Sequence, residues 1–116
     1  MSGRIGICRI TFIQSDGLRT SIDAPNGLTV MTAALRALIP GIEGKCRGSC
    51  SCVTCHVYIE PEWNRIIGAP RLMEESMLDF ADDVTSRSRL GCQIPISAAL
   101  DGLEVHVPGH QRVLGL

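Results

Sequence analysis

The chain has 116 residues, of which 45% are hydrophobic and 20% charged, and its net charge at pH 7 is −1. This is the balance of one ordinary globular domain, so we expect residues 1–116 to form a single domain with a flexible tail over 109–116. The near-neutral charge, with one Trp, one Tyr and two Phe, argues against an electrostatic or stacking surface for nucleic acid. No apolar run approaches the ~18 residues of a membrane-spanning helix and no secretory signal is visible, which predicts a cytoplasmic protein without membrane insertion.

The first elements in the chain are predicted to be a β-hairpin. Residues 4–13 are rich in β-branched side chains, the turn signal Ser15-Asp16-Gly17 follows, and residues 18–22 return as the partner strand. Cys8 lies inside the first of these strands. Because free cysteine is among the most buried residue types, we interpret it as a small core residue and not as a metal ligand.

A helix is predicted next, over residues 30–39. Thr29 is a good N-cap residue, and Pro40-Gly41 should end the helix. The spacing i, i+3, i+4, i+7 predicts one buried apolar face, made of Met31, Ala34, Leu35 and Leu38.

The densest chemical signal in the chain is a group of cysteines within residues 46–55, with one more far downstream. A Cys-x5-Cys-x2-Cys run closed by a distant cysteine supplies the thiolates that hold a 2Fe-2S cluster. The ligands on this spacing are Cys46, Cys52, Cys55 and Cys92, and Cys50 in place of Cys52 is an alternative. Backbone N–H groups of residues 47–53 can surround an anionic cluster, and further hydroxyl donors are available from Ser49, Ser51 and Thr54.

Other uses of the six cysteines fit less well. A disulfide scaffold needs an oxidising compartment, and no export signal is visible. A zinc site made from Cys52, Cys55 and His56 lacks a second well-spaced histidine in the loop, and a Rieske centre needs two histidine ligands. No nucleophile–base pair or open metal position is visible either, so we expect an electron carrier and not an enzyme.

The second half of the chain is predicted to hold short strands around an acidic segment. The strands are expected at 56–60, 93–96 and 103–107, and Trp63 is interpreted as a packing residue. Residues 70–83 carry Glu74, Glu75, Asp79, Asp82 and Asp83 beside an apolar side. On pattern alone, such a charge run is a solvated face.

Three stretches of the chain resemble the adrenodoxin-like (vertebrate-type) 2Fe-2S ferredoxins. They are Cys46-Arg47-Gly48-Ser49-Cys50-Ser51-Cys52-Val53-Thr54-Cys55-His56, Arg87-Ser88-Arg89-Leu90-Gly91-Cys92-Gln93 and Met77-Leu78-Asp79. The resemblance extends from the first strand to Pro108. It implies an α+β fold of the β-grasp type, in which one main helix packs across a mixed sheet, and one 2Fe-2S cluster.

The resemblance also assigns residues around that cluster. It places the ligands at Cys46, Cys52, Cys55 and Cys92. The residues that it implies next to the cluster are Arg47, Gly48, Ser49, Cys50, Ser51, Thr54 and His56. For His56 it implies a structural hydrogen bond behind the cluster that couples the loop to a helix.

The function implied by the resemblance is one-electron transfer in a bacterial cytoplasm. The electrons would pass from an NAD(P)H-dependent, FAD-containing ferredoxin reductase to a cytochrome P-450 monooxygenase, through transient complexes of a monomer. Docking would use the acidic segment, which the family folds as a helix, through Glu74, Glu75, Asp79, Asp82 and Asp83. The spare Cys50 favours an alternative, an electron donor to iron–sulfur assembly proteins, because ferredoxins of those systems look similar at this position.

Overall fold

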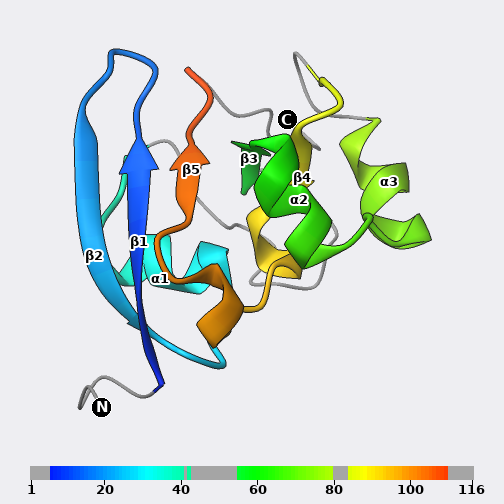
Figure 1. Ribbon diagram of the computed structural model, residues 1–116. Coiled ribbons are helices and arrows are strands. Elements are labelled where there is room, and N and C mark those ends of the chain that lie inside the picture. Colours follow the sequence, from blue (N-terminus) through cyan, green and yellow to red (C-terminus); the bar gives the residue numbers. More distant parts are fainter. Residues whose placement is uncertain (1–5, 41, 43–54, 80–83, 110–116) are drawn as a thin grey trace.

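The computed structural model describes residues 6–40, 42, 55–79 and 84–109 (Figure 1). Several predictions fall outside these residues: those for the loop over 43–54, for Asp82 and Asp83, and for most of the C-terminal tail. None of the described helices has the length and apolar character needed to cross a membrane.

The described strands form one mixed sheet in the order β2-β1-β5-β3-β4. Their bounds are Ile7–Ile13 (β1), Arg19–Pro25 (β2), His56–Ile59 (β3), Ser88–Leu90 (β4) and Glu104–His106 (β5). β1 and β5 run parallel, whereas the other neighbours are antiparallel. The predicted hairpin is the β1–β2 pair, and its turn contains Gly17 at φ +93°, where a residue without a Cβ is favoured.

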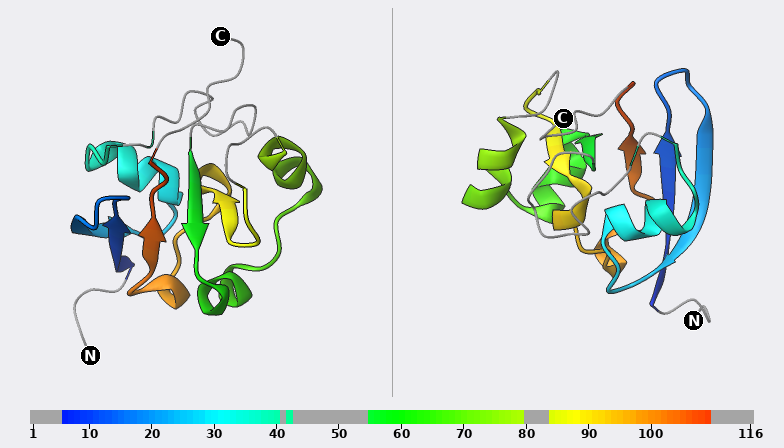
Figure 2. Two further views of the ribbon diagram at one scale, coloured as in Figure 1. Left: turned by 90° about the horizontal axis from the view of Figure 1, so that it is seen from above. Right: turned by 180° about the vertical axis from the view of Figure 1, so that it is seen from behind.

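The helices in the described residues are α1 (Val30–Arg36), α2 (Pro61–Ile67) and α3 (Leu72–Leu78), with short 3-10 turns at η1 (Gly91–Gln93) and η2 (Ala98–Leu100). α1 lies across one face of the sheet, and α3 lies beyond β4, at the end of the sheet opposite β2 (Figure 2). A mixed sheet with a helix across it is the β-grasp arrangement, so the predicted fold class is confirmed.

The core lies between α1 and the sheet. Alternate residues of β1 point into it, so that Cys8, Ile10 and Phe12 are all buried. Other fully buried members are Val30, Ala34, Val57, Ile59, Leu90, Ile94, Leu103 and Val105. The burial predicted for Cys8 is therefore confirmed, and Trp63 packs against the same core while remaining partly exposed.

The helix predicted over 30–39 begins where expected but ends earlier. Thr29 is the N-cap, and its hydroxyl accepts a hydrogen bond from the backbone N–H of Thr32 at 3.1 Å. The helix ends at Arg36, and Leu38 is 85% exposed in the left-handed region at φ +58°. Met31 and Ala34 are buried as predicted, but the prediction was wrong for Leu35, which is exposed within the helix, and for Leu38, which lies beyond its end.

Two further predictions of local structure were incomplete. α2 was not predicted, although Pro61 at the first helical position is a typical start signal. The strand predicted over 93–96 is not formed, because the end of η1 occupies Gln93 and Pro95 makes only an isolated bridge to Thr29.

Candidate metal centre

Cys55 and Cys92 are brought to the same end of two paired strands. Cys55 directly precedes β3 and Cys92 follows β4, and the antiparallel register pairs His56 with Leu90. The backbone N–H of Gly91 donates to the carbonyl oxygen of Cys55 at 2.9 Å. The structure therefore places side by side two cysteine-bearing segments that are far apart in the sequence.

Both thiols are buried. The exposed fraction is 0% for Cys55 and 5% for Cys92. Thiolates are soft donors of the kind that hold iron–sulfur clusters, and a buried position limits access of water. The described part of the predicted ligand set thus fits a 2Fe-2S cluster, while Cys46, Cys52 and residues 47–51, 53 and 54 lie outside the described residues.

Gly91 allows α1 to pack directly against this segment. A Cβ at this position would lie 3.2 Å from the backbone nitrogen of Met31 and 3.3 Å from the carbonyl oxygen of Cys55. Both neighbours are backbone atoms, which cannot rotate away as a flexible side chain can. A side chain at position 91 would therefore push the segment that carries Cys92 away from α1.

His56 is a buried structural residue. Its exposed fraction is 2%, and its Nε2 lies 2.9 Å from the hydroxyl oxygen of Ser88, which also accepts a hydrogen bond from the backbone N–H of Thr85. Its ring meets Tyr58 edge-on, with the ring centroids 5.0 Å apart. This contact joins the beginning of β3 to β4, and the bond to a helix that the resemblance implied stays a prediction.

Glu74 is buried and does not lie on the surface, where a docking residue would have to be. Its side chain is 2% exposed, and its carboxylate accepts from Arg89 Nε at 2.8 Å and from Arg89 Nη2 at 3.1 Å. The same carboxylate accepts from the backbone N–H of Leu90 at 2.9 Å. Glu74 was predicted to be a docking residue, and this prediction was wrong, because its charge is enclosed and paired inside the protein.

Arg89 completes the enclosed pair. Its Nη1 donates to the carbonyl oxygen of Gly68 at 2.7 Å and to the side-chain oxygen of Asn64 at 3.2 Å. The network therefore connects α2, α3 and β4 immediately before Cys92. Arg89 lies within a motif of the family resemblance, but no local pattern in the sequence shows which acid it meets.

The outer side of α3 carries both acidic and apolar side chains. Glu75 and Asp79 are exposed, and Leu72 and Met73 are 79% and 64% exposed. A hollow of about 480 Å³ lies beside α3, between the helix and residues 84–88. Of the predicted docking residues, Glu75 and Asp79 are thus accessible, while Asp82 and Asp83 are outside the described residues.

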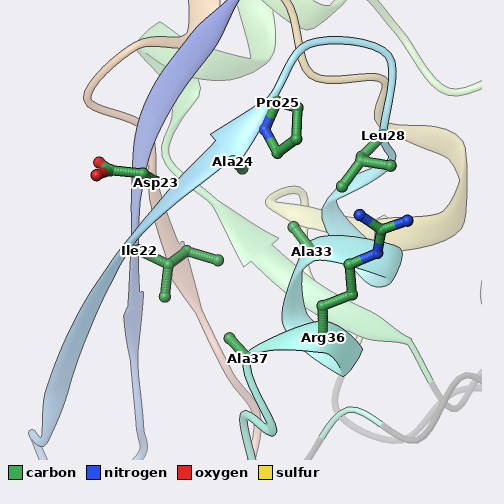
Figure 3. A pocket seen from close by; sticks show the side chains of 8 residues that line it. All are labelled: Ile22, Asp23, Ala24, Pro25, Leu28, Ala33, Arg36 and Ala37. Atoms are coloured by element: carbon green, nitrogen blue, oxygen red, sulfur yellow. The ribbon is translucent and has the colours of Figure 1, made fainter.

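A smaller hollow of about 170 Å³ lies between β2 and α1 (Figure 3). Its lining consists of Ile22, Asp23, Ala24, Pro25, Leu28, Ala33, Arg36 and Ala37. None of the predicted site residues is among them, and most of the lining is apolar. This hollow is therefore separate from the predicted cluster site.

Comparison with known proteins agrees with the cysteine centre. Residues 13–97 match the family model described as a 2Fe-2S iron–sulfur cluster binding domain. A 2Fe-2S ferredoxin from Rickettsia rickettsii is 42% identical over 116 residues, which cover 100% of both chains. The structure of a reduced putidaredoxin variant from Pseudomonas putida matches with a TM-score of 0.87 and 36% identity, covering 90% of this chain and 99% of the other. Putidaredoxin has also been solved in a covalent complex with putidaredoxin reductase, and that structure matches with a TM-score of 0.84, 36% identity and the same coverage.

Proposed function

Because the chain belongs to the family of 2Fe-2S cluster binding domains, and is an electron carrier with one such cluster rather than an enzyme, we propose that it shuttles single electrons between two protein partners. The donor is an NAD(P)H-dependent flavoprotein ferredoxin reductase and the acceptor is a cytochrome P-450 monooxygenase. The observation that carries this proposal is the likeness, over nine-tenths of the chain, to putidaredoxin, which has been solved bound to a reductase.

The proposed ligands are Cys46, Cys52, Cys55 and Cys92. When bound, the cluster supplies a one-electron couple. The chain's own residues hold the two described thiols in place through the Gly91–Cys55 backbone bond and keep both thiols buried. The residues proposed to surround the cluster are Arg47, Gly48, Ser49, Cys50, Ser51, Thr54 and His56, with His56 acting through its contact with Ser88.

The proposed docking surface is the outer side of α3. Glu75 and Asp79 give it negative charge, and the sequence adds Asp82 and Asp83. Each exposed ion pair with a basic partner contributes about 0.2–1 kcal/mol, so these charges chiefly steer and orient the encounter. Leu72 and Met73 add an apolar contact, because both side chains are largely exposed. Weak individual contacts suit a shuttle that must bind and leave quickly.

Carbodiimide cross-linking in lysate of the source organism, followed by mass spectrometry, tests the partners. The holoprotein is compared with a Glu75→Gln/Asp79→Asn variant. A matched control, Asp23→Asn/Glu62→Gln, removes the same number of exposed acids from other elements. We expect a flavoprotein reductase and a haem monooxygenase to be captured by the wild type and the control and to be lost from the α3 variant.

The same experiment separates the alternatives. Capture of a cysteine desulfurase or a cluster scaffold protein, with no haem protein, would replace the P-450 assignment by a role in iron–sulfur assembly. Equal capture by the α3 variant and the wild type would show that docking uses another surface.

A further inference from the structure

A groove of about 350 Å³ opens beside Cys92. It is lined by Thr29, Ile67, Ala69, Arg71, Glu74, Arg89, Cys92, Gln93 and Pro95. The two fully enclosed charges in its wall belong to the Glu74–Arg89 pair, which neutralise each other at 2.8 Å. Arg71 also lines the groove but is exposed to solvent, so neutral donors next to the Cys92 sulfur also contribute to its environment.

Gln93 provides such a donor. Its side-chain Nε2 donates to the Cys92 Sγ, with 3.4 Å between the two atoms. The side chain is partly buried in the groove wall, so the bond is partly sheltered from water. A hydrogen bond of this kind becomes stronger as negative charge on the sulfur increases.

The backbone around Gln93 is fixed from both sides. Before it, the N–H of Gly91 donates to the carbonyl oxygen of Cys55 at 2.9 Å. After it, the carbonyl oxygen of Ile94 accepts from the N–H of Val30 at 2.9 Å, and Ile94 is fully buried. The framework thus positions the Gln93 amide next to the sulfur, and substitution of the side chain leaves these backbone bonds in place.

We propose that Gln93 is a positioning residue that raises the reduction potential of the cluster through its hydrogen bond to the Cys92 sulfur. This inference rests on the proposed ligation by Cys92. One electron enters the cluster on reduction and part of its charge resides on the ligand sulfurs, while the amide keeps its proton throughout. The donor stabilises the reduced form more than the oxidised form, because hydrogen bonds to the sulfurs are among the factors that set the potential.

The test is a spectroelectrochemical titration of the holoprotein and three variants. Gln93→Leu removes the donor at similar size, and Gln93→Asn keeps an amide but withdraws it by one methylene. We expect both to shift the equilibrium between the oxidised and reduced forms about three- to tenfold toward the oxidised form, tenfold being ~59 mV for one electron. Arg71→Lys alters the groove lining but keeps its charge, and its potential should equal that of the wild type.

A second measurement reports the bond itself. Pulsed electron–nuclear resonance of the reduced protein, before and after exchange into D₂O, should show an exchangeable-proton coupling that is lost in Gln93→Leu. If the variants retain the wild-type cluster spectrum and also its potential and proton coupling, the role of Gln93 is overturned while the ligation stands. If Cys92→Ser leaves the visible and magnetic spectra of the cluster unchanged, the proposed ligation itself has failed. Should Gln93→Leu not retain a cluster, the potential of Gln93→Asn decides.

Discussion

The Arg89 side chain carries a positive charge in the interior and is only 5% exposed. It forms an ion pair with the carboxylate of Glu74, whose side chain is 2% exposed. Two charges taken out of water are tolerated because they pair with each other and are hydrogen-bonded to Asn64, Gly68 and the backbone N–H of Leu90. The pair connects α3 to β4 beside Leu90, two residues before Cys92. At the residue scale it is a contact that joins α3 to the segment carrying Cys92.

The first prediction concerns this pair. Glu74→Gln should lower the free energy of unfolding by about 3–5 kcal/mol, because it leaves the buried Arg89 charge uncompensated. Urea unfolding followed by circular dichroism measures the change. Glu104→Gln is the control, since Glu104 pairs with Arg19 while both side chains remain about half exposed, and we expect it to cost about 1 kcal/mol or less. Equal effects of the two substitutions would contradict the enclosed pair.

The second prediction concerns Gly91. Gly91→Ala should destabilise the fold by about 1–3 kcal/mol, because its Cβ would meet two backbone atoms that cannot rotate away. It should also reduce the visible absorbance per chain, since the Cys92 segment is displaced. Gly109→Ala is the matched control, because its Cβ would lie 3.6 Å from the Ser15 hydroxyl oxygen, an ordinary contact. Normal stability and absorbance in Gly91→Ala would refute the close approach of α1.

The third prediction concerns pH. Burial, with the nearby Asp101 carboxylate, raises the pKa of the Cys8 thiol above its ordinary value of 9.0. The unfolded chain therefore loses this proton at a lower pH than the folded chain, and the contribution of Cys8 to stability falls as the pH rises through 9. The difference in unfolding free energy between wild type and Cys8→Ala should accordingly shrink between pH 8 and pH 10. A constant difference over that range would show that the folded thiol titrates normally.

At the scale of the element, the end of α1 explains the exposed Leu38. The N–H of Ile39 donates to the carbonyl oxygen of Ala34 and the N–H of Leu38 donates to that of Leu35, which is the hydrogen-bond pattern of a Schellman motif. Such an ending places its C′ residue in the left-handed region, and here that residue is Leu38 at φ +58°. The following Ile39 is buried, so the motif turns the chain back onto the core.

The fourth prediction follows from this ending. A residue with a Cβ costs roughly 1–2 kcal/mol in the left-handed region, and part of this is offset by the greater freedom of glycine in the unfolded chain. Leu38→Gly should therefore raise the free energy of unfolding by up to about 1 kcal/mol, with little loss of packing because the side chain is 85% exposed. Thermal unfolding measures the change, with Leu18→Gly, which replaces another exposed leucine just before β2, as the control that should not be stabilised. A lower melting temperature for Leu38→Gly than for the wild type would contradict the assigned ending.

At the scale of the whole molecule, the strand order places the β1–β2 hairpin and α3 at opposite ends of the sheet. α1 packs on one face of the sheet, and α3 lies beyond β4, away from the β1–β2 hairpin (Figure 2). The cysteine-bearing segments adjoin β3 and β4, the two strands of the sheet nearest to α3. A partner that contacts α3 therefore approaches the side of the molecule that carries Cys92.

The fifth prediction rests on this arrangement and on the proposed function. The rate of reduction by the reductase should fall with ionic strength, because exposed charges are screened by salt. Glu75→Gln/Asp79→Asn should lower the rate several-fold at low salt and flatten its salt dependence, whereas Asp23→Asn/Glu62→Gln should leave both unchanged. Stopped-flow absorbance measures the rates. The same salt dependence in all three proteins would place the docking surface away from α3.

Features that depend on neighbours along the chain could be predicted from the amino-acid sequence. The hairpin turn at Gly17, the N-cap at Thr29 and the cysteine spacing are local patterns, and residues close in sequence must be close in space. The resemblance of the cysteine loop and of the segment ending at Gln93 added the fold and the cofactor. These parts could be predicted because they need no knowledge of how distant segments pack.

The tertiary structure alone decided which side chains are enclosed and what they contact. In the sequence, Glu74 is one of five acids in the same segment. Only the structure shows that Arg89, fifteen residues later, packs against it. Leu38 fits a helical repeat until the chain turns so that Ile39 can be buried instead. The hydrogen bond from Gln93 to Cys92 depends on the backbone that Gly91 and Ile94 fix between β3 and α1. The physical reason is that the free energies of burial and charge pairing depend on contacts between distant segments. A pattern of neighbouring residues does not show those contacts.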